Sequence, residues 1–308
     1  MSFVHLRTHT EYSVVDGTLR IDDLAPAAKA DGQVALGVSD LNNLFGAIKF
    51  YKACRGKGIK PLIGVDVWME PLALDGGADK NPSRLLLLVQ DRHGYLNVCE
   101  LLARAWTQNA QRTQAWVKWD WLRELAGGRI VLSGADLGAV GQALLAGDTE
   151  RAAHVAQQLA DIFPQRFYLE LQRAGLPTNE AQVRAAVPLA ARLGLPVVAT
   201  HPVQYLAPED FEAHEARVCV AEGETLSNPK RVKRFSREQY FKTQAQMAEL
   251  FADVPSAVAN TLAIAQRCNL SLVLGKPQLP NFPTPDGSPM DVYFRVASFE
   301  GLEKRLLQ

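Results

Sequence analysis

The sequence is poor in cysteine and has no excess of charge of either sign. Its four cysteines lie far apart and form no CxxC pair. They therefore predict reduced thiols, more often core residues than metal ligands, and argue against a disulfide framework. The 33 basic and 33 acidic side chains give a formal net charge of zero. This balance argues against bulk electrostatic binding of nucleic acid, which normally leaves a basic excess.

Long apolar runs and nucleotide-binding loops are also missing. No apolar stretch approaches the roughly 20 residues that a membrane-spanning helix needs. The first residues, MSFVHLRTH, do not form a signal-peptide pattern. The sequence contains no GxGxxG and no Walker A motif, which disfavours dinucleotide and P-loop binding. The absence of a membrane-spanning run and of a signal-peptide pattern predicts a cytoplasmic protein.

Short apolar, β-branched runs alternate with amphipathic stretches over the first 200 residues. Several runs are apolar almost throughout, as in a sheet that is covered on both faces. About seven β–α alternations predict a parallel sheet, most simply closed into a barrel. An open doubly wound sheet is the alternative. The segment 115–122 (AWVKWDWL) predicts an amphipathic helix against the barrel. The expected strands are 3–8, 34–40, 61–69, 84–91, 129–134, 166–171 and 196–201.

The pattern becomes mainly helical from about residue 207. Helices are expected within 208–223, 237–251 and 254–268, before a stretch rich in Pro and Gly at 270–288, which is typical of a linker. Residues 290–308 again have helical spacing and end without a cap. We expect the chain to be a fragment that stops at the start of a further domain.

Polar residues follow the expected strands where an α/β barrel carries its chemistry, at the carboxyl ends. The set contains three aspartates and one or two histidines, a combination that normally suggests a divalent-metal hydrolase. One position departs from that chemistry, because Arg7 stands in the first place of a His-x-His pattern and a guanidinium has no lone pair for a metal. The residues are Arg7, His9, Asp16, Asp40, Leu41, Asp66, Ala135 and the segment 201–204.

The chain resembles the N-terminal PHP (polymerase and histidinol phosphatase) domains of bacterial replicative DNA polymerase III alpha subunits. The resemblance covers nearly the whole chain and includes HLRTHTEYSVVDG, LGVSDLNNLFGAIKFYKACRGKGIKPLIGVD, LPVVATHPVQYL and LPNFPTP. It implies a distorted (β/α)7-type PHP barrel with additional C-terminal helices over residues 1–270. Residues 271–308 would be a linker and the truncated start of the following polymerase domain.

Metal-loaded members of this family use about nine ligands, and the resemblance implies that most are lost here. His9 and Asp16 are retained, and Asp66 replaces a glutamate. We therefore expect a degenerate site that binds no metal, because such sites need several oxygen or imidazole donors in fixed geometry. The positions without a competent ligand are Arg7, Leu41, Arg84, Ala135, Pro202 and Gln204.

The two arginines also suggest what replaces the metal. Arg7 and Arg84 would place fixed positive charge opposite Asp16, Asp40 and Asp66. A guanidinium binds a carboxylate with two parallel hydrogen bonds. We therefore hypothesise an internal Arg–Asp network that keeps the pocket neutral.

The resemblance implies a non-catalytic scaffold that docks the separate proofreading exonuclease subunit and other polymerase subunits. No cofactor is expected in this fragment, whereas a later domain of the parent chain would use Mg²⁺ for template-directed DNA synthesis. The alternative is an active metal-dependent phosphoesterase, a 3′–5′ exonuclease or a pyrophosphatase, with His5 and His201 joining His9, Asp16 and Asp66. A histidinol-phosphate-type phosphatase is a weaker alternative.

A run of basic residues supplies the remaining candidate site. Lys230, Arg231, Lys233 and Arg234 could contact DNA phosphates, although a solvated loop is the commoner explanation of such a run.

Overall fold

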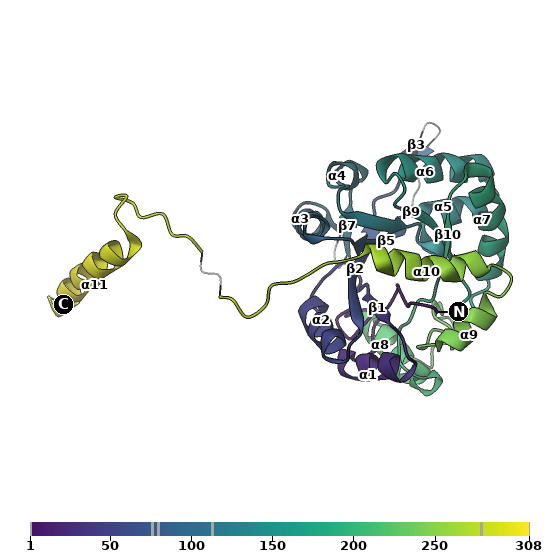
Figure 1. Cartoon of the computed structure of the whole chain (residues 1–308), viewed down its shortest axis with the longest axis horizontal. Coiled ribbons are helices and arrows are strands. Elements are labelled where there is room, and N and C mark those ends of the chain that lie inside the picture. The colour runs from purple at the N-terminus through teal and green to yellow at the C-terminus, as the bar shows by residue number, and fades with distance from the viewer. Residues whose placement is uncertain (1, 75–76, 79–80, 112–113, 278–279, 308) are drawn as a thin grey trace. The chain divides into compact units, whose positions relative to one another are not determined.

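A curled β-sheet surrounded by helices forms most of the chain in the computed structural model (Figure 1). The structure describes residues 2–74, 77–78, 81–111, 114–277 and 280–307. The chain divides into two units, Met1–Ser271 and Leu272–Gln308. The first unit contains the whole sheet.

The strands of the main sheet follow the spatial order β10-β9-β8-β5-β2-β7-β6, with β1 beside β2. Two further short strands, β3 (Ala73–Leu74) and β4 (Gly77–Ala78), pair only with each other. The main strands are β1 (Ala35–Val38), β2 (Lys60–Met69), β5 (Ser83–Val89), β6 (Ala110–Gln111), β7 (Gln114–Val117), β8 (Arg129–Leu132), β9 (Phe167–Gln172) and β10 (Val197–Thr200).

The N-terminal segment lies between β1 and the chain that follows β10, and so closes the curled sheet. The amide of Gly37 in β1 donates to the carbonyl of His5 at 2.7 Å, and the amide of His9 donates to Val203, just after β10, at 2.9 Å. A Cβ atom at Gly37 would lie 2.9 Å from the carbonyl oxygens of His5 and Leu6, so the close approach depends on glycine. The predicted strand at 3–8 is therefore a backbone-paired closing segment rather than a regular strand.

The predicted mixed α/β fold is confirmed, but the expectation of a wholly parallel sheet is wrong. β1–β2, β8–β9 and β9–β10 are parallel, whereas β5 is antiparallel to both β2 and β8. The described residues between β2 and β5 contain no α-helix, and strands that are joined without a helical crossover pair antiparallel. The uniformly apolar sequence of β5 reflects burial on both faces and does not reveal strand direction.

Helices cover the outside of the sheet, and the segment 115–122 differs from its predicted helix. Its first residues lie in β7, and a helix begins only at Trp119. The helices of the larger unit are α1 (Ile21–Ala30), α2 (Ala47–Gly56), α3 (Arg92–Gln108), α4 (Trp119–Glu124), α5 (Ala139–Leu145), α6 (Thr149–Ile162), α7 (Asn179–Leu193), α8 (Phe211–Glu222), α9 (Gln244–Leu250) and α10 (Pro255–Arg267), with 3-10 turns at Ala135–Leu137 and Pro208–Asp210.

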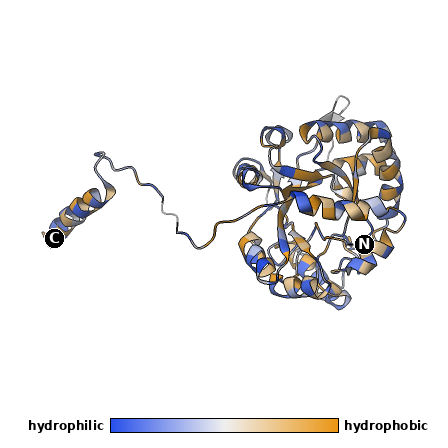
Figure 2. Ribbon diagram, viewed as in Figure 1, coloured by the Kyte–Doolittle hydropathy of each residue, from blue (hydrophilic) through white to orange (hydrophobic). Residues whose placement is uncertain are grey.

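The core lies inside the curled sheet and is closed at one end by α10. The apolar strands are visible in Figure 2, and α10 crosses them in Figure 1. The amide of Val4 donates to Thr261 Oγ1 of α10 at 3.1 Å. α10 therefore covers the end at which the parallel strands begin, and the opposite end carries the polar cluster described below. The core residues are Val4, Leu6, Ala35, Leu62, Leu86, Leu88, Ile130, Leu132, Tyr168, Val198, Ile264, Ala265 and Cys268.

The described residues of the second unit include one helix, α11 (Met290–Leu306). None of its described residues is buried. Among the helices of the described residues, none is long and apolar enough to cross a membrane.

Candidate functional site

Arg7 stands at the centre of a buried polar cluster. Its guanidinium donates to both carboxylate oxygens of Glu170, from Nε at 2.8 Å and from Nη2 at 3.0 Å. Its Nη1 atom donates to Asp66. Burial would lower the pKa of Arg7, but the two carboxylates outweigh burial and raise it. Arg7 is therefore a permanently charged link between strands β2 and β9.

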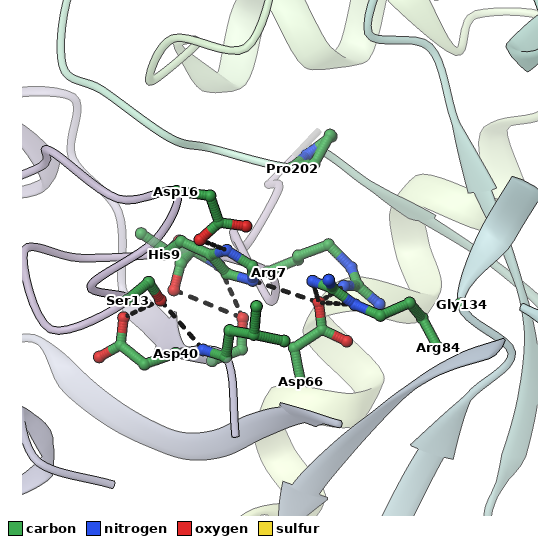
Figure 3. A network of polar contacts seen from close by, with 12 residues as sticks. Arg7, His9, Ser13, Asp16, Asp40, Asp66, Arg84, Gly134 and Pro202 are labelled. Atoms are coloured by element: carbon green, nitrogen blue, oxygen red, sulfur yellow. Dashed lines mark hydrogen bonds and ion pairs between the residues drawn. The ribbon is translucent and has the colours of Figure 1, made fainter. Parts of the chain in front are cut away.

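Asp66 receives a second guanidinium from the neighbouring strand. Arg84 of β5 donates to Asp66 Oδ2 from Nε at 3.2 Å and also from Nη2. The guanidinium carbon of Arg84 lies 4.6 Å from the ring centroid of Trp68, a distance typical of a cation–π contact. Burial would raise the pKa of Asp66, but Arg7 and Arg84 hold it far below its ordinary value. Figure 3 shows both arginines converging on this carboxylate.

His9 forms a second group of charges with Asp16. Its Nδ1 atom lies 3.0 Å from Asp16 Oδ1, and its Nε2 atom lies 3.2 Å from Asp66 Oδ2. Burial would lower the pKa of His9, but the two carboxylates raise it to about 9. The raised pKa favours the imidazolium, in which Nδ1 donates to Asp16 and Nε2 donates to Asp66. Gln204 Nε2 lies 3.3 Å from Nδ1, and as a donor it forms no hydrogen bond with the protonated nitrogen.

Asp40 does not join the arginines, so this part of the Arg–Asp hypothesis is wrong. Its carboxylate accepts from the amide of Thr10 at 2.6 Å and from the hydroxyl of Ser13 at 2.8 Å. Burial raises the pKa of Asp40 and outweighs these hydrogen bonds. Asp40 therefore fixes the turn that carries Asp16, and the arginines pair with Asp66 and Glu170 instead.

Glu170 was not predicted from the sequence, although it completes the cluster. Besides Arg7, it accepts from the amide of Gly134 at 3.0 Å and from Gln172 Nε2 at 3.0 Å. The side chain is fully buried in β9. A single carboxylate in the apolar run FYLELQ is the signal that could have indicated it, because a buried charge needs a partner.

Three of the remaining family ligand positions, Leu41, Ala135 and Pro202, offer no metal donor in their side chains, whereas Gln204 keeps a buried amide oxygen. Leu41 pairs through its backbone with Asp66. Ala135 is buried in a left-handed conformation with φ 47°. Pro202 lies beside the cluster in Figure 3.

His5 and His201 do not enter the cluster as the phosphoesterase alternative would require. His5 Nε2 donates to the carbonyl of Lys242 at 2.7 Å, and His201 Nε2 donates to the carbonyl of Glu238 at 2.8 Å. Burial lowers the pKa of His5 to about 4 and the pKa of His201 to about 3. Both are neutral side chains that hold the segment 238–242 against the barrel.

The cluster is balanced in charge. Three cationic side chains face three carboxylates, and most donor atoms are already occupied. Asp66 Oδ1 and Gln204 Oε1 are buried oxygens with no hydrogen-bond partner in the part of the chain that the structure describes. In the described part of the chain, no group of three or more His, Cys, Asp or Glu side chains has an arrangement that could hold a metal. The six charged residues are Arg7, His9, Arg84, Asp16, Asp66 and Glu170.

The basic run is only partly at the surface. Arg231 pairs with Glu215, and each of these side chains is 4% exposed. Arg234 lies 3.4 Å from Glu222 and keeps 65% exposure. Lys230 and Lys233 are exposed. Three of the four predicted residues therefore remain accessible.

His214 connects the cluster to the C-terminal helices. Its Nε2 atom donates to the carbonyl of Asp16 at 2.8 Å, and its ring packs against Tyr205 and Phe235. The turn that carries Asp16 is therefore held from the α8 side.

Comparisons with known proteins point to one family. The PHP domain pattern matches residues 5–174. The chain is 46% identical over 306 residues to DNA polymerase III subunit alpha from Pseudomonas aeruginosa, and 42% identical over 304 residues to the subunit from Escherichia coli K12. It is 46% identical over 310 residues to the subunit from Neisseria meningitidis serogroup B.

These alignments cover nearly all of this chain but only part of the relatives. They include 99% of this chain and 26% of the Pseudomonas and Escherichia proteins. The chain therefore spans about a quarter of the length of the curated relatives it matches. An amidohydrolase structure from Chromobacterium violaceum is similar with a TM-score of 0.42 and 12% identity, covering 70% of this chain and 97% of that chain.

Proposed function

The chain belongs to the PHP domain family, and from this membership we propose that it is the PHP region of a DNA polymerase III alpha subunit. The proposal rests on identity of 42–46% across almost the full chain. In this proposal the parent protein performs template-directed DNA synthesis with Mg²⁺ in a separate domain and works in the cytoplasm. The region described above contributes no catalytic residue to that reaction.

The observation that carries the non-catalytic part of the proposal is the position of the Arg7 guanidinium. It binds Glu170 with two hydrogen bonds and also contacts Asp66. A divalent cation at Asp66 would lie beside two guanidinium groups, since Arg84 also contacts this carboxylate. Like charges so close in a buried site repel strongly. The donor set therefore fits a metal poorly, and we assign the pocket a structural role without any cofactor.

A thermal melt tests this assignment. We expect the Tm of the chain to be the same in EDTA, in Mn²⁺ and in Zn²⁺, because a ligand stabilises a fold only if it binds the folded state. A rise in Tm with Mn²⁺ that disappears in Asp66→Asn would contradict the assignment. Hydrolysis of a phosphodiester by the same metal-loaded protein would support the phosphoesterase alternative.

We further propose that this region is a scaffold that docks the proofreading exonuclease subunit. A pocket that is stabilised by ion pairs suits a rigid support, and a polymerase whose own pocket lacks a metal would depend on a partner chain for proofreading. Co-elution of the purified chain with a purified exonuclease subunit in size-exclusion chromatography would support docking. Separate elution at micromolar concentrations of both would argue against it.

DNA contact by the accessible basic residues is a weaker part of the proposal. Lys230, Lys233 and Arg234 are exposed, and a phosphate backbone attracts such side chains. Replacing all three with glutamine should lower the salt dependence of DNA binding by the parent polymerase. An unchanged salt dependence would mean that these three side chains are solvated and do not contact DNA.

A further inference from the structure

A second group of arginines lies at the end of the barrel that α10 covers. Arg129 is the first residue of β8, Arg166 precedes β9, and Arg267 is the last residue of α10. The parallel strands begin at this end, whereas the Arg7–Asp66 cluster lies further along them. The two groups of arginines are therefore separate sites.

Two of the three guanidinium groups contact the ring of Phe163, and the third binds the turn between α6 and β9. The guanidinium carbons of Arg129 and Arg166 lie 5.8 Å and 5.7 Å from the ring centroid of Phe163. Arg166 Nη1 donates to the carbonyl of Ala126 at 2.8 Å. Arg267 donates to the carbonyl of Gln165 at 2.7 Å and to the hydroxyl oxygen of Tyr168 at 2.8 Å. All of these hydrogen-bond partners are uncharged.

The charge of this group is not balanced by the protein. Among the residues that the structure describes, none of the three arginines forms an ion pair with a carboxylate, in contrast to Arg7 and Arg84. Burial and the charge of Arg267 lower the pKa of Arg166, and Asp91 opposes this effect. The carboxylate of Asp91 is itself engaged by the amide of Gly94 at 2.9 Å.

Arg129 carries unused hydrogen-bond donors. The side chain is fully buried, and Nη2 donates to the carbonyl of Leu125 at the end of α4. Its Nε and Nη1 atoms have no hydrogen-bond partner among the described residues. A buried guanidinium with free donors is costly unless an acceptor is supplied. Burial and the charge of Arg166 also lower the pKa of Arg129 to about 10.

We propose that Arg129, Arg166 and Arg267 form a binding site for a phosphate group. A phosphate has several acceptor oxygens and carries up to two negative charges, so it can satisfy more than one guanidinium at once. The ammonium of Lys60 supports the same end of the barrel, where it donates to the carbonyl of Ala265 and to Asn269 Oδ1, each at 2.7 Å. Free phosphate and the phosphodiester backbone of a nucleic acid share this chemistry.

Inorganic phosphate is the first probe. The Tm of the chain is measured over a phosphate titration at constant ionic strength, with chloride as the balancing anion. We expect a saturable rise, as for any ligand of the folded state. Arg166→Gln should weaken the apparent Kd about tenfold, the equivalent of one lost charge-assisted hydrogen bond. Arg184→Gln removes the same charge from an exposed position of α7 and should leave the Kd unchanged.

The other outcomes decide against the site. An equal rise in the parent and in Arg166→Gln, or the same rise with acetate, would overturn the proposal. If Arg166→Gln does not unfold cooperatively in chloride, Arg267→Gln is the second variant with the same expected loss. Binding of a short single-stranded oligothymidylate then distinguishes between free phosphate and a nucleic-acid backbone as the ligand. Binding that is lost in the same variant assigns the site to a nucleic-acid backbone, and binding of phosphate alone assigns it to a free phosphate compound.

Discussion

At the scale of single residues, the buried polar cluster depends on charge pairs that cannot be removed one at a time. Asp66 is fully buried and receives two guanidinium groups, while Glu170 is fully buried and receives one. Removing one partner of a buried pair leaves an uncompensated charge, whereas removing both can be almost neutral. The cluster therefore predicts strongly non-additive effects of mutation.

Arg7→Met should lower the free energy of unfolding by about 3–5 kcal/mol, because it leaves Glu170 without its bidentate partner. The double variant Arg7→Met/Glu170→Gln should recover part of this loss, because the unpaired charge is gone. Urea denaturation measures both values. Arg192→Met is the control, since its pair with Glu150 is exposed and should contribute less than about 1 kcal/mol. Equal losses in Arg7→Met and the control would contradict the role of Arg7.

His9 predicts that stability decreases in mildly alkaline solution. Its pKa is raised from 6.5 to about 9 in the folded protein, so the folded state holds a proton that the unfolded state releases. The contribution is complete below pH 6.5 and is lost as the pH rises through 9. Between pH 7 and pH 9, the unfolding free energy of the parent should fall more steeply than that of His9→Gln. Parallel curves for the two proteins would show that His9 is not protonated.

His5 and His201 predict that the unfolding free energy decreases as the solution becomes acidic. Burial lowers the pKa of His5 to about 4 and the pKa of His201 to about 3. The unfolded state therefore binds more protons as the pH falls below 6.5, and stability is lost from there towards pH 4. His201→Gln should reduce this slope in urea titrations at several pH values. A slope identical to that of the parent would mean that His201 does not contribute.

The sequence indicated the cations of the site better than it indicated their partners. The prediction that Arg7 and Arg84 pair with Asp66 is confirmed. Arg7 and Asp66 could be placed from the strand ends, whereas Arg84 was indicated only by the resemblance to the PHP family. Asp40 was wrongly assigned to the same network, since the hydroxyls of Thr10 and Ser13 in the N-terminal segment satisfy it. Glu170 was missed because a pairing over 163 residues of separation depends on how the sheet closes.

At the scale of strands and helices, apolar periodicity located most elements but not their directions. Six of the seven expected runs are strands, yet β5 runs antiparallel to its neighbours. A strand that is buried on both faces has the same sequence pattern in either direction. The antiparallel direction of β5 also determines where Arg84 lies in the site, because it places Arg84 opposite Trp68 in β2.

Closure of the sheet depends on Gly37. An added methyl group would lie 2.9 Å from two carbonyl oxygens of the N-terminal segment, so the segment would have to move. Gly37→Ala should cost about 1–3 kcal/mol of stability, which is typical of overpacking. Chemical denaturation gives the value, and Gly56→Ala is the control because nothing lies within 4 Å of its added methyl group. A Gly37→Ala protein as stable as the parent would mean that β1 and the N-terminal segment are loosely packed against each other.

At the scale of the whole molecule, every residue of the core cluster belongs to the first unit, Met1–Ser271. A chain that ends at Ser271 should therefore unfold at the same temperature as the full chain, within about 2 °C. Differential scanning calorimetry makes the comparison. A markedly lower Tm would show that residues beyond Ser271 contribute to the stability of the barrel.

The central claim is that ion pairs replace metal ions in this PHP domain, and its most direct test is metal content. The purified chain is incubated with Mn²⁺ and Zn²⁺, freed of excess metal, and measured by elemental mass spectrometry. Guanidinium groups on Asp66 predict less than about 0.1 equivalent of bound metal, because metal binding requires unprotonated donors that are free to coordinate. One or more equivalents, lost in both His9→Ala and Asp16→Ala, would contradict the account and identify a working metal site.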